Sequence, residues 1–169
     1  MSKRNTRKIK RRLGKGKDSY VYACKEPDFV VQYTLNPYLQ PARNLQAKLV
    51  KIDPEEKFFI HYRPETACTY NRKSSAKWKY KTIHVMKKVI PLVGLNREQY
   101  RHLNKAVTLL QDNNIAHLDL PNNVMMDPKD NMPRIIDWGE SKMYASKKDA
   151  ELGTSIDRNA FLRNYKIQK

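Results

Sequence analysis

The order of apolar and polar positions predicts a series of short strands in the first half of the chain. Residues 20–24 and 29–33 are rich in β-branched and aromatic side chains, and a short turn containing Pro27 separates them. This pattern is typical of a β-hairpin. The same composition predicts further strands over residues 57–62 and 78–89.

Helical spacing occurs in three places. Apolar residues recur every three or four positions within 41–52, which predicts a short amphipathic helix. A longer helix is expected from Asn96 onward, because Asn96 and Gln99 have capping-box spacing and the apolar residues that follow share one face. A last helix is predicted over residues 156–165.

Two further strand-like runs, 123–126 and 134–136, flank a turn and predict a small second hairpin. The predicted strands cluster around single helices and do not alternate with them. This order is typical of an α+β fold and disfavours a parallel Rossmann sheet.

Length and composition place the chain among globular proteins. It has 169 residues, of which 40% are hydrophobic and 30% are charged. This length predicts one domain, or one domain divided into two small lobes. The longest apolar stretch, residues 89–95, is far shorter than the roughly 20 residues of a spanning helix, so we expect no membrane association.

Cys24 and Cys68 have no partner spacing, and the four histidines are scattered, so no metal motif is visible. The N-terminus is basic without an apolar segment behind it, which does not resemble a secretory signal. We therefore expect two free thiols in a reducing intracellular compartment, the cytoplasm or the nucleus.

The positive charge is concentrated in two strips. The formal net charge is +17, and residues 1–17 contain nine Lys and Arg without an acidic residue. Residues 66–97 contain eight and again no acidic residue, whereas the rest of the chain is almost neutral. Residues 1–12 are predicted to form a flexible basic arm. Clustered positive charge indicates an anionic partner.

The second strip interleaves Tyr70, Trp78 and Tyr80 with basic residues. This mixture suits nucleic acid, because aromatic faces stack on bases and cations neutralise phosphates. Alternatively, Trp78 and Tyr80 belong to the core of a strand whose lysines face solvent. An acidic protein partner or solubility alone explains the basic arm equally well.

Three short motifs follow one another along the chain. They are Gly14-x-Gly16 before the first hairpin, His117-x-Asp119 with Asn123 after the long helix, and Asp137-Trp138-Gly139 after the second hairpin. Each alone is ordinary turn chemistry. In this order they resemble the protein-kinase superfamily, with its glycine-rich loop, H-x-D…N catalytic loop and D-[FW]-G metal site.

The resemblance extends from about Leu13 to the end of the chain. It implies a single kinase-like domain over residues 13–169, with ATP and Mg²⁺ as cofactors. A small antiparallel N-lobe sheet with one helix is expected over residues 13–90, and a reduced helical C-lobe over residues 91–169.

The resemblance also implies a role for each matching residue. Asp119 looks like the catalytic base, Asn123 a catalytic-loop metal ligand and Asp137 the principal Mg²⁺ ligand. His117 is implied to brace the loop, and Asp157 resembles the residue that anchors it from a helix. The implied nucleotide-binding residues are Gly14, Gly16, Lys17 and Gln32.

The sequence departs from the family pattern at the nucleotide site. Gln32 stands where the family has a lysine that contacts the ATP phosphates and pairs with a glutamate, and the predicted helix 41–52 contains no glutamate. Lys15, Lys17 and Lys25 are candidates to replace that lysine.

Two more departures concern the second half of the chain. Asp119 and Asn123 are four residues apart where the family usually has five, and no A-P-E segment follows Asp137. The sequence in this respect is similar to small atypical kinases, such as the kinase of the KEOPS tRNA-modification complex and reduced kinase-like proteins of large DNA viruses.

The leading interpretation is an ATP- and Mg²⁺-dependent phosphotransferase of the Ser/Thr protein-kinase type that acts on a protein substrate. The alternative is an inactive pseudokinase, used as a basic, nucleic-acid-associated or structural component of a larger assembly or virus particle. In that case the strips 1–17 and 66–97 would contact nucleic acid or an acidic protein.

Overall fold

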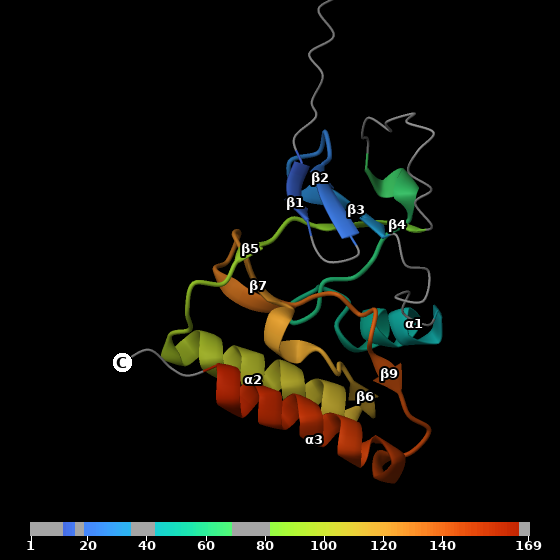
Figure 1. The fold of residues 1–169 in the computed structure, drawn as a ribbon, viewed down its shortest axis with the longest axis vertical. Helices are drawn as coiled ribbons and strands as arrows, with labels where there is room; N and C mark the ends of the chain where they lie inside the picture. Colours follow the sequence, from blue (N-terminus) through green and yellow to red (C-terminus); the bar gives the residue numbers. More distant parts are fainter. Residues whose placement is uncertain (1–11, 16–18, 35–42, 69–81, 166–169) are drawn as a thin grey trace, which may run out of the picture. The chain divides into compact units, whose positions relative to one another are not determined.

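The computed structural model describes residues 12–15, 19–34, 43–68 and 82–165. The chain divides into two compact units, and Figure 1 labels most of their helices and strands. The sheet unit comprises Met1–Pro37 and Tyr62–Lys88, and the helical unit comprises Tyr38–His61 and Val89–Lys169. The segment from Tyr38 to His61, which we assigned to the N-lobe, thus belongs to the helical unit.

The sheet unit contains one four-stranded antiparallel sheet in the order β1-β2-β3-β4. Its strands are β1 (Arg12–Lys15), β2 (Ser19–Ala23), β3 (Phe29–Thr34) and β4 (Thr82–Lys87). The predicted first hairpin is therefore confirmed as β2 and β3. A 3-10 turn, η2 (Glu65–Ala67), belongs to the same unit.

Two predictions fall partly outside the described residues. Residues 1–11 of the predicted basic arm are not described, and Arg12 does not belong to an arm, because it pairs with Tyr22 in the sheet. Of the strand predicted over 78–89, the structure describes β4 only from Thr82. The two interpretations of Trp78 and Tyr80 also lie outside the described residues.

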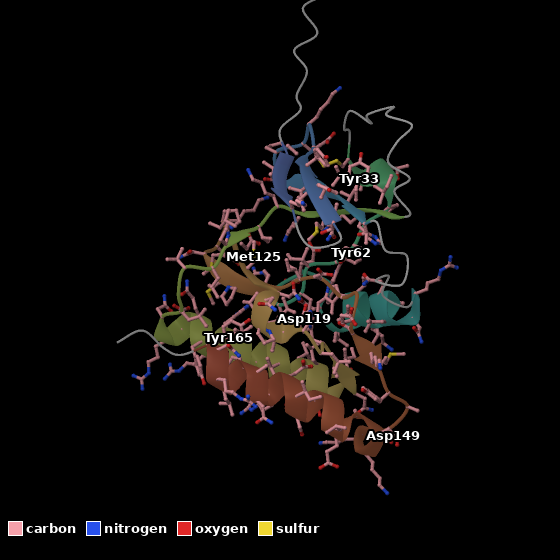
Figure 2. All side chains as sticks on the ribbon, in the orientation of Figure 1. Tyr33, Tyr62, Asp119, Met125, Asp149 and Tyr165 are labelled. Atoms are coloured by element: carbon pink, nitrogen blue, oxygen red, sulfur yellow. A yellow bond between two sulfur atoms is a disulfide. The ribbon has the colours of Figure 1, made fainter. Side chains whose placement is uncertain are left out.

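The two cysteines are joined in the core of the sheet unit, so the prediction of free thiols is wrong. Cys24 and Cys68 form a disulfide with Cα atoms 5.8 Å apart, which Figure 2 draws in yellow. They are 44 residues apart in the sequence and are buried with Val31, Tyr33 and Val85. Only the pairing of distant strands brings them together, and sequence spacing does not reveal such a pairing.

The helical unit combines three helices with two small sheets. Its helices are α1 (Arg43–Ile52), α2 (Arg97–Asp112) and α3 (Lys147–Asn164). One sheet has the order β5-β7-β8, with strands β5 (Ile90–Pro91), β7 (Val124–Asp127) and β8 (Met132–Ile135). The other sheet pairs β6 (Ile115–Ala116) with β9 (Lys142–Met143). The predicted second hairpin is confirmed as β7 and β8.

Helix α2 begins where the sequence predicts. The Asn96 side chain accepts from the Gln99 backbone N–H, and the Gln99 side chain accepts from the Asn96 backbone N–H, so the capping box is complete. Leu103, Val107 and Leu110 are buried on one face. Helix α3 lies beside α2, as Figure 1 shows.

The strand predicted over residues 57–62 is wrong. The buried Asp53 carboxylate accepts backbone hydrogen bonds from Lys57, Phe58 and Phe59 at 2.7–2.9 Å, so the chain wraps around this side chain. Only an isolated bridge between Phe59 and Ile135 resembles sheet pairing there. The Asp53 carboxylate thus takes three successive backbone N–H groups, and β8 pairs with this segment only at Ile135.

Helix α3 begins nine residues earlier than the predicted 156–165. Its first half buries only Ala150 and Gly153, which are small, and the later buried positions are Asp157 and Phe161. This narrow stripe carries little apolar signal, so periodicity misses the first turns. None of the helices in the described segments has the length and apolar character that crossing a bilayer requires.

Candidate active site

The residues of the predicted catalytic loop lie together in the helical unit. Asp119 follows β6, Asn123 comes after a 3-10 turn, η3 (Leu120–Asn122), and Asp137 follows β8. Figure 2 labels Asp119 in this loop. The site is thus built from short irregular segments at the ends of strands.

The Asn123 side chain is hydrogen-bonded to Asp119. Its Nδ2 donates to the main-chain oxygen of Asp119 at 2.8 Å and to Asp119 Oδ2 at 2.9 Å. Asn122 Nδ2 donates to the other carboxylate oxygen at 3.3 Å. These contacts orient the Asn123 amide, because its nitrogen is used by Asp119 and its oxygen is the end left for another ligand.

The short spacing between Asp119 and Asn123 is accommodated by η3. Pro121 lies in this turn, and the Asn123 backbone N–H donates to Leu120 O at 3.2 Å. The Leu120 side chain is fully buried. The 3-10 turn therefore brings the Asn123 side chain back to Asp119 with one residue fewer than the family pattern has.

His117 braces the loop and has no ring nitrogen left for proton transfer. Its Nε2–H donates to Ile136 O at 2.8 Å, and Nδ1 accepts the Asp119 backbone N–H at 3.3 Å. Because a carbonyl only accepts, these partners assign the neutral tautomer with the proton on Nε2. Burial lowers the pKa of His117, in agreement with a neutral ring.

Asp157 anchors the same loop from α3, as predicted. Its carboxylate accepts the backbone N–H groups of His117 and Leu118, the latter at 2.8 Å. Burial raises the pKa of Asp157 to about 6, although both N–H groups act in the opposite direction. The buried carboxylate thus holds two successive backbone amides of the loop.

Two residues of the site have left-handed backbone conformations. Leu118 has φ 69° and Asp137 has φ 59°. Such a conformation costs a non-glycine residue of the order of 1–3 kcal/mol and persists where the surroundings impose it. For Leu118 that constraint is the hydrogen bond that its backbone N–H donates to Asp157 Oδ1.

Trp138 holds the segment next to Asp137. Its side chain is fully buried, its Nε1 donates to Ile60 O at 2.9 Å, and its ring meets the Phe59 ring edge-on at 5.5 Å. The Ile136 N–H donates to Asn123 O at 2.9 Å, so the backbone before Asp137 lies beside Asn123.

Tyr165 is a residue of the site that sequence reasoning missed. Its hydroxyl donates to Leu120 O at 2.7 Å from the end of α3, and Figure 2 labels it. Burial raises the pKa of Tyr165, with a further contribution from the charge of Asp119. A single tyrosine after a helix carries no pattern that could have revealed this contact.

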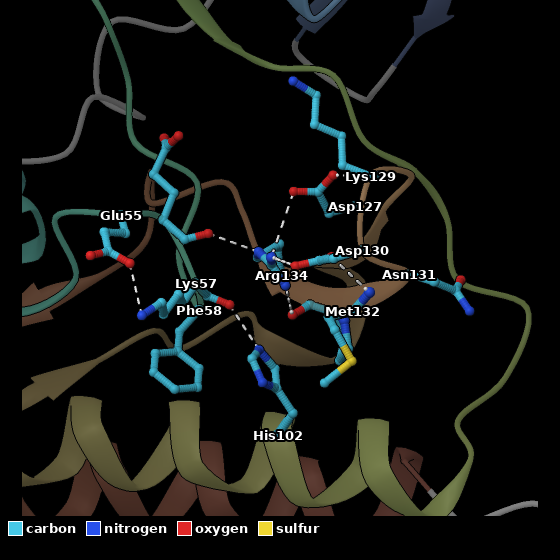
Figure 3. Close-up of polar contacts among 12 residues, drawn as sticks. Glu55, Lys57, Phe58, His102, Asp127, Lys129, Asp130, Asn131, Met132 and Arg134 are labelled. Atoms are coloured by element: carbon cyan, nitrogen blue, oxygen red, sulfur yellow. Dashed lines mark hydrogen bonds and ion pairs between the residues drawn. The ribbon is translucent and has the colours of Figure 1, made fainter.

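A polar cluster around the buried Arg134 supports the second hairpin (Figure 3). The guanidinium donates to Asp130, lies 3.6 Å from the Asp127 carboxylate and donates to Glu56 O at 2.8 Å. His102 of α2 donates to Lys57 O at 2.8 Å. The cluster ties β8 to the segment around Asp53 and is structural in character.

Two of the predicted nucleotide-binding residues, Gly14 and Gln32, lie in described strands of the sheet unit. Gly14 pairs with Val21, Val21 pairs with Gln32, and Gln32 pairs with His84, so these four positions form one row across the sheet. Gln32 is 8% exposed, and its Oε1 has no hydrogen-bond partner among the described residues. Gly16 and Lys17 lie outside the described residues.

Asn123 and Asp137 have the ligand chemistry that a magnesium ion prefers. Mg²⁺ prefers oxygen ligands, and Asn123 and Asp137 supply an amide oxygen and a carboxylate. Because Asn123 Nδ2 donates to Asp119, the amide oxygen is the end that a cation would meet.

The architecture defines a reduced kinase-like fold of the α+β class, as the sequence predicts. The structure of the Cydia pomonella granulovirus kinase PK-1 is similar, with a TM-score of 0.56 and 20% sequence identity over 82% of this chain. The chain spans about half the length of that kinase, covering 55% of it. No protein-family model matches the sequence, and no curated protein matches it.

Proposed function

We propose that this protein is an ATP- and Mg²⁺-dependent phosphotransferase of the protein-kinase type that acts on a Ser or Thr hydroxyl of a protein. The observation that supports the proposal most strongly is the pair of hydrogen bonds that Asn123 Nδ2 donates to Asp119, one to its main-chain oxygen and one to Oδ2. One amide then orients the proposed base and presents an oxygen to a metal.

In this proposal each residue of the loop has a separate task. Asp119 orients the acceptor hydroxyl and takes its proton, while Asn123 and Asp137 hold Mg²⁺. Bound Mg²⁺ supplies positive charge that neutralises the phosphate oxygens. Asp157 and His117 keep the loop backbone in place, which limits the reorganisation that the chemical step requires.

The test measures binding and chemistry separately in the full chain. Thermal shift with ATP, with and without Mg²⁺, reports binding, and transfer of the labelled γ-phosphate to the protein itself or to test proteins reports chemistry. Asp119→Asn should keep nucleotide binding and lower transfer by about 10²-fold or more, the scale for a lost positioned base. Asp137→Asn should abolish the Mg²⁺-dependent part of the ATP shift.

Asp112→Asn is the matched control, because this exposed carboxylate ends α2 and is not part of the loop. This variant should change neither the thermal shift with ATP and Mg²⁺ nor the transfer of the γ-phosphate. Equal transfer by wild type and Asp119→Asn would contradict the role of Asp119. Unaltered Mg²⁺-dependent ATP binding in Asp137→Asn would contradict the metal assignment.

Gln32 favours a second candidate, a pseudokinase used as a basic binding module of a larger assembly. A neutral side chain at this position weakens any contact with a phosphate, because charge-assisted hydrogen bonds are the stronger ones. The fold shared with a granulovirus kinase is compatible with a component of a virus particle. On this reading the wild type transfers no phosphate to any test protein.

Gln32→Lys distinguishes a weakened kinase pocket from a repurposed one. A retained pocket should bind ATP more tightly once the ammonium is present. Burying a lysine without a paired carboxylate could instead cost several kcal/mol of stability. An unchanged ATP affinity in a folded variant would indicate that the pocket no longer serves ATP.

A further inference from the structure

We propose that Cys24, Glu26 and Cys68 form a zinc site in the reduced protein, and that the disulfide closes this site in the oxidised protein. The inference concerns the sheet unit and is independent of the phosphotransferase proposal. It rests on three side chains that could each supply one metal ligand, whose ligand atoms all lie within 4.8 Å of one another.

The fold brings these ligands together from two distant segments. Cys24 follows β2, and Glu26 lies in the turn before β3, where its carbonyl oxygen accepts the Phe29 N–H at 3.2 Å. Cys68 follows η2, and the bridge from Arg63 to Val85 holds that segment beside β4. The positions of the ligands are therefore set by sheet pairing.

The chemistry of the ligand set favours zinc. Thiolates select soft or borderline metals such as Zn²⁺, and a carboxylate is a frequent additional ligand. With Zn–S near 2.3 Å and Zn–O near 2.1 Å, ligand atoms on one zinc can be at most about 4.6 Å apart. The three ligand atoms lie within 4.8 Å of one another, and the two sulfurs, which are bonded to each other in the oxidised protein, separate on reduction to share one ion. Three protein ligands would leave a fourth position for water.

The burial of the sulfurs agrees with this assignment. Cys24 and Cys68 are each 7% exposed, whereas Glu26 is half-buried. Glu26 thus brings a carboxylate oxygen next to two sulfurs within an apolar core. A zinc ion bound by the two thiolates would gain this carboxylate as a third ligand.

The two states exclude each other for reasons of electron balance. A dithiol reductant supplies two electrons and two protons, which break the S–S bond, yield two thiols and convert the reductant to its own disulfide. Zinc then displaces the two thiol protons and binds the thiolates. A disulfide oxidant reverses the sequence: it accepts two electrons from the two thiolates and two protons from solvent, becomes a dithiol, and the S–S bond forms as the ion is released. Occupancy therefore follows the thiol redox state.

The experiment titrates the full chain with Co²⁺ and then Zn²⁺, after reduction with a phosphine and removal of oxygen. Reduced wild type should bind one Co²⁺ with a thiolate-to-cobalt charge-transfer absorption that Zn²⁺ abolishes. Oxidised wild type should neither bind Co²⁺ nor show this absorption. Cys24→Ser or Cys68→Ser should lose the absorption and lower zinc affinity by more than about 100-fold, beyond the effect of altering an outer partner.

Glu26→Gln tests the third ligand without removing either sulfur or the disulfide. It should lower zinc affinity at least about 10-fold. Asp28→Asn is the matched control on the same turn, outside the ligand group, and should bind like wild type. Equal affinity of Glu26→Gln and Asp28→Asn would overturn the three-ligand site.

Two further outcomes would also overturn the proposal. One is a reduced wild type that stays folded by far-UV circular dichroism and binds no stoichiometric metal. The other is a reduced wild type that unfolds and does not regain its structure when Zn²⁺ is added.

Discussion

Gly153→Ala provides a test of how α3 is seated, because two physical effects predict opposite signs. In an unconstrained helix the change stabilises by about 0.5–1 kcal/mol, since glycine has the poorer helix propensity. Gly153 is buried, however, and a Cβ at this position would lie 2.8 Å from Ala116 Cβ and 2.9 Å from Tyr144 Oη. Non-bonded carbons prefer about 3.5–4.0 Å.

The clash should exceed the gain in helix propensity. The Tyr144 hydroxyl is the end of a flexible side chain and can move, but Ala116 Cβ is attached directly to the backbone of β6. Overpacking of this kind costs typically about 1–3 kcal/mol. After subtraction of the propensity gain, Gly153→Ala should destabilise the protein by about 0.5–2 kcal/mol.

The assay is urea denaturation followed by far-UV circular dichroism. Ser155→Ala is the control, because this exposed α3 position has no such contact and should change stability little. Adding Ala116→Gly to Gly153→Ala removes the clashing methyl group, so the double-mutant cycle should show a favourable coupling. Stabilisation by Gly153→Ala alone, or additive effects in the cycle, would refute the close approach of α3 to β6.

Three other perturbations test the fold and the basic arm. Because burial raises the pKa of Asp157 from 3.8 to about 6, the folded protein holds this proton more tightly than the unfolded chain. The contribution of this proton to the free energy of unfolding is full below about pH 4 and falls by about 3 kcal/mol as the pH rises through 6. The difference in stability between wild type and Asp157→Asn should therefore change by that amount over this pH range. A difference that does not vary with pH would contradict the raised pKa. Arg134→Ala should destabilise by about 3–5 kcal/mol in denaturation, because it removes a buried cation that pairs with the Asp127 and Asp130 carboxylates and donates to Glu56 O, whereas the exposed Arg101→Ala should be neutral. Deleting residues 1–11 removes six Lys and Arg and should flatten the salt dependence of nucleic-acid binding, while stability stays unchanged. On duplex, the slope of log affinity against log salt concentration is about −0.9 per phosphate contacted. If neither DNA nor RNA binds more tightly than about 10⁻⁴ M at physiological salt, the arm has another role.

Local signals in the sequence determined the elements that form from neighbouring residues. The first hairpin follows from two β-rich runs around a turn, and the start of α2 follows from the capping box that Asn96 forms with Gln99, three positions later. The order of the three motifs along the chain was sufficient to predict the kinase-like fold class. The loop anchor at Asp157 was found in the same way, although the roles of Asp119, Asn123 and Asp137 in catalysis stay predictions.

Tertiary structure decided the features whose partners are distant in the chain. The Cys24–Cys68 disulfide depends on sheet pairing, and the contact from Tyr165 to Leu120 depends on where α3 ends. The segment after Asp53 has strand composition but folds around a buried carboxylate. Periodicity and capping report interactions within a few residues, whereas these three contacts arise only after strands and helices have docked. The sequence by itself therefore determined the fold class, and the tertiary structure determined these long-range contacts.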